Sequence, residues 1–411
     1  MFSFSIEKKL DGTLARAGKI STPHGDILTP AFIPVATRAT VKTLTPHQLQ
    51  ELGAQATLAN TYHLYLRPGE QLIKDAGGLG KFMSWPGPTF TDCGGFQVFS
   101  LGAAYKKGIS KFIATDVHDD VDSSKPAVFD EDLATSHGKL ALIDEEGVTF
   151  TSHIDGSLHR FTAERSIEIQ HALGADIIFA FDECTSPTEG REYQKEAMER
   201  THRWAERSLK THRQMLPRQS ASSPRPSALF GIVQGGQFSD LRAESAKFLA
   251  DMNFDGYGIG GSFTKKDLEE NLKVVNTILP EEKPRHLLGI GEPSDIFLGV
   301  ELGADTFDCV APTRTARNGT IYTKHGTIGI KNEEFQKDFR PIEEDCGCYT
   351  CQNFSRAYVS YLQRIGEYLG AELGSVHNVY FIVNLVKNIR QSILDDTFTE
   401  FKNSFLKTYY S

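Results

Sequence analysis

Short apolar runs alternate along the chain with longer segments that carry helix start and stop signals. Strands buried in a parallel sheet have near-continuous apolar runs of this kind, because both of their faces are covered. The pattern predicts eight such strands, at residues 31–37, 56–59, 88–91, 175–181, 228–233, 256–259, 285–290 and 305–310. Most are followed by a predicted helix. The clearest begins at Thr45, a candidate N-cap, continues with Pro46 and ends at Gly53.

Six further helices complete the alternating pattern. They are predicted at residues 68–76, 162–173, 190–215, 239–251, 265–279 and 293–302. A strand followed by a helix, repeated eight times, is the signature of the α/β class and of a (β/α)8 TIM barrel. Active-site residues of that fold lie at the carboxyl ends of the strands. Polar residues at those positions are therefore expected to converge in space.

The repeat is interrupted between the third and fourth strands. Residues 101–146 are polar and rich in Asp, Lys and Ser, which predicts an insertion at about 101–150. A β-hairpin is predicted close to it, with strands at 147–150 and 158–161. A long loop is uncommon inside a compact domain, so the insertion either covers something or is mobile.

Composition and charge narrow the class of protein. The 411 residues are 39% hydrophobic and 24% charged, as in globular proteins. A formal net charge of −9 argues against nucleic-acid binding over the whole surface, but it leaves a local basic patch possible. The N-terminus lacks a signal pattern, and no apolar run reaches membrane-spanning length. We therefore expect a cytoplasmic enzyme.

Carboxylates stand at the ends of three predicted strands. Asp92, Asp182 and Asp308 occupy these positions, and Gln234 follows a fourth strand. Glycosidic chemistry uses one carboxylate at the anomeric carbon and a second acid/base for the leaving group, while a third can accept from the N–H groups of a purine. A single Asp in such a place is usually a helix cap. Three on one barrel face favour a functional site.

Glycine pairs accompany these polar residues. Gly94 and Gly95, Gly235 and Gly236, and Gly260 and Gly261 would let backbone groups approach a planar ligand. Tight turns after the strands explain them equally well. Phe96 could stack on a base or belong to the core. Cys93 and Cys184 lack an evident paired His, so small buried residues are the simpler interpretation.

A cysteine cluster near the C-terminus indicates a metal site. Cys346, Cys348 and Cys351 follow the spacing C-x-C-x2-C, and His377 is the best downstream candidate for a fourth ligand. Three thiolates and one imidazole would form a closed tetrahedral zinc site, which is structural rather than catalytic. The alternatives are three reduced cysteines in a turn and a hydrogen-bonded core histidine.

The zinc cluster suggests a division of the chain into two parts. Residues 1–340 would form the barrel with its insertion, and residues 341–411 a zinc-binding subdomain with C-terminal helices packed on the barrel. Basic residues concentrate near this boundary. Arg314 and Arg317 would share one face of a helical turn and could hold phosphates, although a solvated face is the alternative.

Taken together, these motifs resemble the tRNA-guanine transglycosylase family over nearly the whole chain. The motifs that carry the resemblance are Asp92 to Gln97, Asp182 to Cys184, Val233 to Gly236, Phe307 to Arg314, Asn60 to Leu64, Ser152 to Ser157, and the set Cys346, Cys348, Cys351 and His377. The resemblance implies a pentosyltransferase that exchanges guanine in tRNA for a 7-deazaguanine without cutting the backbone. One structural Zn2+ per chain is implied as well.

Roles for individual residues follow from the same resemblance. Asp308 would be the nucleophile at the ribose anomeric carbon, and Asp92 the general acid/base. Arg314 and Arg317 would hold the anticodon loop. The remaining implied contacts are with the base: Asp182, Gln234, Gly261 and Ser262 would recognise it, and Phe96 and Leu288 would sandwich it.

Two residues depart from the family pattern. Cys93 stands where the family usually has Ser, and Leu288 stands where Met is common. Cys184 is typical of bacterial members, which insert 7-aminomethyl-7-deazaguanine at the wobble guanine of a U-G-U loop as a step of queuosine biosynthesis, and a homodimer is implied. The alternatives are a non-catalytic RNA-binding partner subunit, a DNA-directed deazaguanine transglycosylase, and a barrel glycoside or zinc hydrolase.

Overall fold

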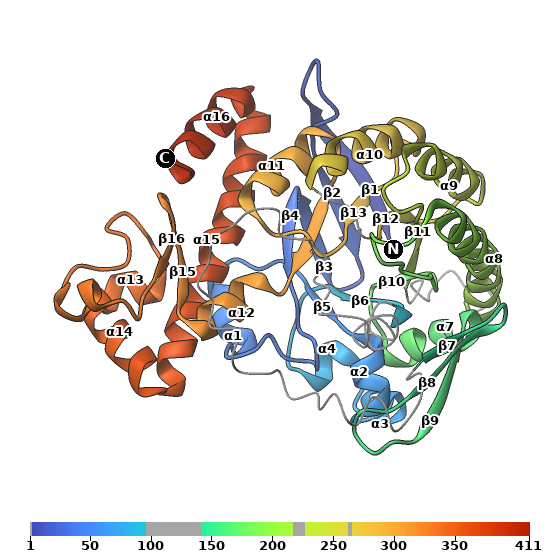
Figure 1. The fold of residues 1–411 in the computed structure, drawn as a ribbon, viewed down its shortest axis with the longest axis horizontal. Coiled ribbons are helices and arrows are strands. Elements are labelled where there is room, and N and C mark those ends of the chain that lie inside the picture. The colour runs from blue at the N-terminus through green and yellow to red at the C-terminus, as the bar shows by residue number, and fades with distance from the viewer. Residues whose placement is uncertain (1, 96–140, 217–226, 262–264) are drawn as a thin grey trace.

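A parallel eight-stranded sheet forms the centre of the protein (Figure 1). The structure is a computed structural model that describes residues 2–95, 141–216, 227–261 and 265–411. The strands lie in the order β4 (Ala31–Pro34), β14 (Thr306–Cys309), β13 (Arg285–Leu287), β12 (Gly256–Ile259), β11 (Ala228–Val233), β10 (Ile177–Phe179), β6 (Thr89–Thr91) and β5 (Thr57–Ala59). A parallel bridge between Val35 and Leu58 links the two ends of the sheet. The predicted barrel is therefore confirmed.

Helices follow the strands as the sequence pattern predicts. The predicted helices correspond to α1 (Pro46–Glu51), α3 (Glu70–Asp75), α7 (Ala163–Leu173), α8 (Arg191–Met215), α9 (Ser239–Asp251), α10 (Lys265–Ile278) and α11 (Pro293–Glu301). Thr45 caps α1 through a reciprocal capping box with Gln48. Two short helices were not predicted, α2 (Thr61–Leu66) and α4 (Leu79–Phe82). The former begins directly after β5 and turns out to shape the site.

Two small antiparallel sheets flank the barrel. The hairpin predicted near residue 150 is confirmed as β8 (Gly147–Thr151) and β9 (Leu158–Thr162), with β7 (Ala141–Ile143) as a third strand. Residues 101–140 of the predicted insertion lie outside the described residues. The second sheet was not predicted and comprises β1 (Ser3–Lys9), β2 (Arg16–Thr22) and β3 (Gly25–Thr29). Arg16 anchors it to the barrel through a buried ion pair with Asp305, whose Nη2–Oδ2 distance is 2.6 Å.

The C-terminal region lies along one flank of the barrel, coloured orange to red in Figure 1. It comprises α12 (Ala311–Asn318), β15 (Thr320–Thr323), β16 (Gly326–Gly329), the 3-10 helix η2 (Glu333–Lys337), α13 (Tyr349–Asn353), α14 (Arg356–Ile365), α15 (Tyr368–Leu394) and α16 (Phe398–Tyr409). The long helix α15 packs against α12, β4 and β2 on one side and α13 and α14 on the other. The domain boundary at residue 340 stays a prediction. In the described part of the chain, no helix has the length and apolarity to cross a membrane.

Candidate active site

The predicted site residues lie at or near the carboxyl ends of four barrel strands. Asp92 comes directly after β6, Asp182 after β10, and Gln234 after β11, while Asp308 lies within β14 near its carboxyl end. Since these strands are parallel, their carboxyl ends open onto the same face. The structure thus places three carboxylates and an amide at the face where enzymes with this fold have their active sites.

Two donors hold the Asp308 carboxylate by one oxygen. The Nε2 atom of His286 lies 3.0 Å from Asp308 Oδ1, and the backbone N–H of Gly289 donates to the same oxygen at 2.8 Å. The Asp308 side chain keeps 12% of its surface exposed, whereas His286 is fully buried. The carboxylate is therefore oriented by a buried imidazole and a backbone N–H while its side chain keeps a small exposed fraction.

The Asp92 carboxylate lies against the start of α2. Its Oδ1 accepts from the backbone N–H of Thr61 at 2.8 Å and from that of Gly94 at 3.2 Å, and its Oδ2 accepts from the side-chain amide of Asn60. The Thr61 hydroxyl in turn donates to the backbone carbonyl of Asp92. Asn60, Thr61 and Gly94 therefore hold the Asp92 carboxylate in place. A carboxylate held in this way is suited to giving or taking a proton at one position.

Asp182 is bridged to its neighbours through both carboxylate oxygens. Cys93 Sγ lies 2.9 Å from Asp182 Oδ1, and the Nε2 amide of Gln234 donates to Asp182 Oδ2 at 2.5 Å. Burial, followed by the charges of Asp182 and Asp92, raises the pKa of the Cys93 thiol well above its usual value. The raised pKa favours the protonated thiol as the donor to Asp182. The burial of Cys93 confirms the prediction of a small buried residue.

Glycines let these loops approach one another closely. A Cβ at Gly95 would lie 2.5 Å from the backbone oxygen of Asp182. Gly261 has φ +89°, and a Cβ there would lie 2.7 Å from both Gln234 Oε1 and Arg242 Nη2. These contacts support the interpretation as tight turns that pack the loops together, and the approach of a planar ligand stays a prediction.

Arg242 ties these turns to α9. Fully buried, it donates from Nε to the backbone oxygen of Gly236 at 2.8 Å and from Nη1 to that of Gly260 at 2.7 Å. The loops after β11 and β12 are therefore held by one guanidinium. Sequence reasoning missed Arg242, because nothing in its local pattern separates it from other helical arginines.

Leu288 covers the glycine turns from the next strand. Its Cδ1 would lie 3.3 Å from a Cβ at Gly258 and 3.5 Å from one at Gly260, and its side chain is half-buried. This position suits one wall of a slot for a planar base. Phe96 and Ser262, the other predicted base contacts, lie outside the described residues.

Basic side chains gather beside the site at α12. Arg314 is exposed, and Arg317 donates from Nε to the backbone oxygen of Thr313 at 3.1 Å. Burial first, and then the charges of Arg317 and Arg38, lower the pKa of Lys42. Arg38 and Lys42 follow β4, so positive charge from two neighbouring strand ends accumulates at the same part of the rim.

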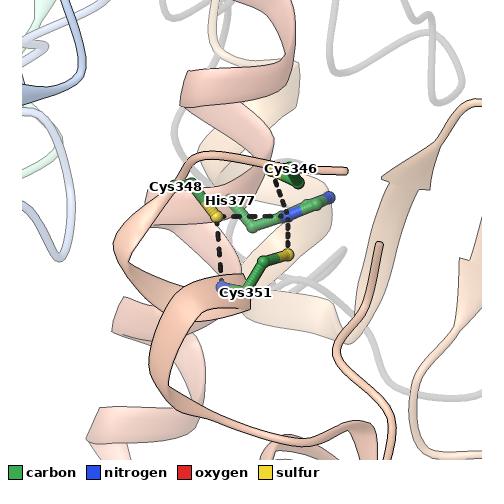
Figure 2. A group of neighbouring side chains, drawn as sticks. All are labelled: Cys346, Cys348, Cys351 and His377. Atoms are coloured by element: carbon green, nitrogen blue, oxygen red, sulfur yellow. Dashed lines mark hydrogen bonds between the residues drawn. The ribbon is translucent and has the colours of Figure 1, made fainter. Parts of the chain in front are cut away.

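The predicted zinc ligands meet in one buried cluster. The Nδ1 atom of His377 lies 3.8, 3.5 and 3.2 Å from the Sγ atoms of Cys346, Cys348 and Cys351, and Figure 2 shows the four side chains converging. Ligands about 2.0 to 2.3 Å from a tetrahedral Zn2+ are separated by about these distances. His377 Nε2 lies 2.7 Å from the backbone oxygen of Tyr322, which leaves Nδ1 as the ligating atom. The donor set therefore fits a structural zinc ion.

Comparisons with known proteins agree with these observations. The family model described as queuine tRNA-ribosyltransferase matches residues 11–411. A queuine tRNA-ribosyltransferase from Desulforamulus reducens is 48% identical over 407 residues, covering 98% of each chain. Those from Natranaerobius thermophilus and Enterococcus faecalis are 46% and 44% identical, covering 99% of this chain and 99% and 96% of their own. The chain belongs to the queuine tRNA-ribosyltransferase family.

Membership in the queuine tRNA-ribosyltransferase family confirms the resemblance derived from the motifs. The match extends over both the barrel and the Cys3His cluster, so the cluster is consistent with the structural zinc expected for this family. Besides Arg242, three contributors were missed as individual residues. Asn60 and Thr61 belong to a quoted motif without an assigned role, and His286 gave no local signal.

Proposed function

We propose that this chain exchanges a base in tRNA, replacing guanine by a 7-deazaguanine through a covalent bond between Asp308 and the ribose. One observation carries the proposal: close contacts link the site residues into a continuous arc. Asp92 contacts Gly94, Cys93 contacts Asp182, and Asp182 contacts Gln234. The arc continues from the Gly260 turn through Leu288 and Gly289 to Asp308.

Each part of the arc has a chemical task. Asp308 attacks the anomeric carbon, and Asp92 gives a proton to the departing guanine and takes one from the incoming base. Asp182 and Gln234 present oxygen atoms and an amide to the edge of the base, while Leu288 covers one of its faces. The guanine must leave the RNA stack to enter this slot, as in enzymes that flip bases.

The basic rim at α12 holds the RNA in this proposal. Arg314, Arg317 and Lys42 would contact phosphates of the anticodon loop and place the wobble guanine of a U-G-U sequence over the site. The incoming base would be 7-aminomethyl-7-deazaguanine, in a step of queuosine biosynthesis, because the motif Asp182 to Cys184 resembles the bacterial form. We place the activity in the cytoplasm, where its tRNA substrate is.

A homodimer is the second part of the proposal. Aromatic and aliphatic side chains lie exposed on α13, α14 and the start of α15, among them Tyr349, Tyr361, Ile365 and Tyr368. Contiguous exposed apolar groups of this kind mark interaction surfaces. A second copy of the chain would cover them. Light scattering should give twice the monomer mass for the wild type and a monomer for Tyr361→Glu, and a wild-type monomer would contradict the assignment.

The decisive experiment is mass spectrometry of a U-G-U hairpin incubated with the protein and 7-aminomethyl-7-deazaguanine. We expect the mass shift of base exchange with the wild type and none with Asp308→Asn. Asp26→Asn, which changes an exposed carboxylate on β3, serves as the matched control and should react normally.

The outcomes separate the alternatives. RNA binding without a mass shift, with either this base or queuine, would favour a non-catalytic subunit. A DNA hairpin of the corresponding sequence should be incubated in parallel. A mass shift of the DNA hairpin, with none of the RNA hairpin, would favour a DNA-directed enzyme. A shift that persists in Asp308→Asn would remove Asp308 as the nucleophile.

A further inference from the structure

The segment that carries Asp182 continues beyond the barrel sheet. The strand β10 ends at Phe179, and the N–H of Ala180 still donates to the backbone oxygen of Phe230 at 2.9 Å. Residues 181–186 are buried, but they belong to no helix or strand. Buried backbone groups outside a sheet need hydrogen-bond partners from elsewhere, and α8 supplies several of them.

A row of polar side chains on α8 faces this segment. The row consists of Gln194, Thr201 and Ser208, which are all buried and lie seven residues apart. Seven residues are close to two helical turns, so the three side chains share one face of the helix. The N–H of Phe181 donates to Ser208 Oγ at 3.1 Å, and that of Glu183 donates to Thr201 Oγ1 at 3.0 Å. The helix therefore holds the backbone on both sides of Asp182.

Side chains of the segment alternate in direction, as they do in an extended strand. Phe181 stacks on Trp204 of α8 at a centroid distance of 4.9 Å, and Glu183 forms a buried ion pair with Arg200 of the same helix. Asp182, which lies between them, points towards the loops after β6 and β11, to which it bonds. A shift of the segment by one residue would turn Asp182 away from these loops. Contacts with α8 thus fix the register in which Asp182 faces the site.

Gln194 contacts two of the loops at once. Its Oε1 accepts from the Thr185 hydroxyl at 2.5 Å, and its Nε2 donates to the backbone oxygen of Ser186 at 2.8 Å. The same amide lies against the turn after β11, because a Cβ at Gly236 would lie 2.6 Å from its Cδ and Oε1 atoms. Gly236 is two residues beyond Gln234. One buried amide therefore joins the loop of Asp182 to the turn that follows Gln234.

We propose that Gln194 is a positioning residue that determines how selectively the site binds guanine. The inference rests on the proposed function, in which Asp182 and Gln234 recognise the base. Contacts at the Asp182 carboxylate orient its oxygen atoms, whereas Gln194 acts on the backbone that carries them.

The chemistry of the base explains the effect on selectivity. Guanine presents the N–H groups of its ring and of its 2-amino group, and an ionised carboxylate accepts from both. Hydrogen bonds weaken steeply when the acceptor moves out of line. A displaced Asp182 would therefore lose affinity for guanine. It would lose less affinity for hypoxanthine, which lacks the 2-amino group and has fewer donors to offer.

Four variants of the full-length protein test the proposal. Gln194→Met keeps a side chain of similar length but removes both hydrogen-bonding groups. Lys195→Met, at the adjacent exposed position of α8, is the matched control. Thr201→Val removes the acceptor for the Glu183 N–H, and Thr201→Ser retains it.

Selectivity can be measured with free purines. Guanine and hypoxanthine would each be used as inhibitors of base exchange, and the ratio of their inhibition constants reports the preference for the 2-amino group. Fluorescence anisotropy of a labelled U-G-U hairpin would measure RNA binding. Melting temperatures would monitor folding.

We expect Gln194→Met to raise the inhibition constant of guanine roughly tenfold and that of hypoxanthine by less than about threefold. The dissociation constant of the hairpin should change by less than about threefold, because its phosphates are held at the basic rim. Thr201→Val should narrow the ratio by a smaller factor, and Thr201→Ser should restore it. Lys195→Met should match the wild type.

Several results would overturn the proposal. A wild-type ratio in Gln194→Met contradicts it, and so do equal increases for both purines, which would indicate a general structural role. Should Gln194→Met fail to fold, an unchanged ratio in Thr201→Val would contradict it instead. A wild type that exchanges no base would refute the proposed function itself, which is a distinguishable outcome.

Discussion

Cys93 donates its thiol hydrogen to Asp182 over a Sγ–Oδ1 distance of 2.9 Å, which links the loop after β6 to the loop after β10. The raised pKa of this buried thiol keeps it protonated, so the donor persists across the neutral pH range. A hydroxyl can donate the same hydrogen bond, so Ser at this position should preserve the link.

Replacement of Cys93 should therefore affect base recognition selectively. We expect Cys93→Ser to keep base-exchange activity within about threefold, and Cys93→Ala to raise the KM for the incoming base roughly tenfold, since Asp182 loses one donor. The KM for RNA should change little in either variant. Steady-state kinetics with each substrate varied in turn would measure this. A normal base KM in Cys93→Ala would show that the bond does not orient Asp182.

The basic rim can be tested through the salt dependence of RNA binding. Arg314→Ala should weaken binding of the hairpin and lower the slope of log K against log salt by about 0.7 to 0.9, the share of one phosphate contact. Arg314 is exposed, so the fold should be unaffected. Lys210→Ala, an exposed position on α8, provides the control and should leave the slope unchanged. An unaltered slope for Arg314→Ala would remove it from the interface.

Local patterns were sufficient to predict the barrel. Its strands are mostly apolar because they are buried on both faces, and each candidate carboxylate lies at or near the carboxyl end of a strand. The cysteine spacing is equally local, and His377, 26 residues beyond Cys351, was found because a tetrahedral site needs a fourth ligand.

Features that depend on pairing between distant segments were not predicted. The strand β1 alternates exposed and half-buried residues, so it lacks the apolar run that marks the barrel strands. His286 contacts Asp308 because of the register between β13 and β14, and Arg242 contacts two glycine turns that are distant in sequence. Neither contact can be predicted from the residues that neighbour His286 or Arg242 in the sequence.

Removal of zinc should destabilise the protein without directly removing a reacting group. The cluster joins the loop before α13 to α15, and His377 also contacts the β15 backbone through Tyr322. We expect the wild type to bind about one zinc ion per chain. Cys351→Ser should lose most of this zinc, and its melting temperature should be lower by several degrees. Atomic absorption and thermal melts would measure both. Chelated wild type should recover after zinc is returned, and an unchanged melting temperature after zinc loss would contradict a structural role.

A buried histidine pair predicts how stability depends on pH. His171 Nε2 on α7 lies 2.9 Å from His212 Nδ1 on α8. Burial first, and then the charge of His212, lower the pKa of His171 from 6.5 to about 4. Between pH 6.5 and pH 4, His171 binds a proton in the unfolded chain but not in the folded protein. The free energy of unfolding therefore decreases as the pH falls from 6.5 towards 4. Above pH 6.5 the contribution is fully present.

Urea unfolding at pH 7 and pH 5 would measure this effect. The wild type should lose on the order of 1 kcal/mol more between the two pH values than His171→Gln, whose side chain cannot take up a proton. His47→Gln, at an exposed position on α1, is the matched control and should retain the wild-type difference. Equal losses in the wild type and His171→Gln would mean that His171 is protonated as readily in the folded protein as in the unfolded chain.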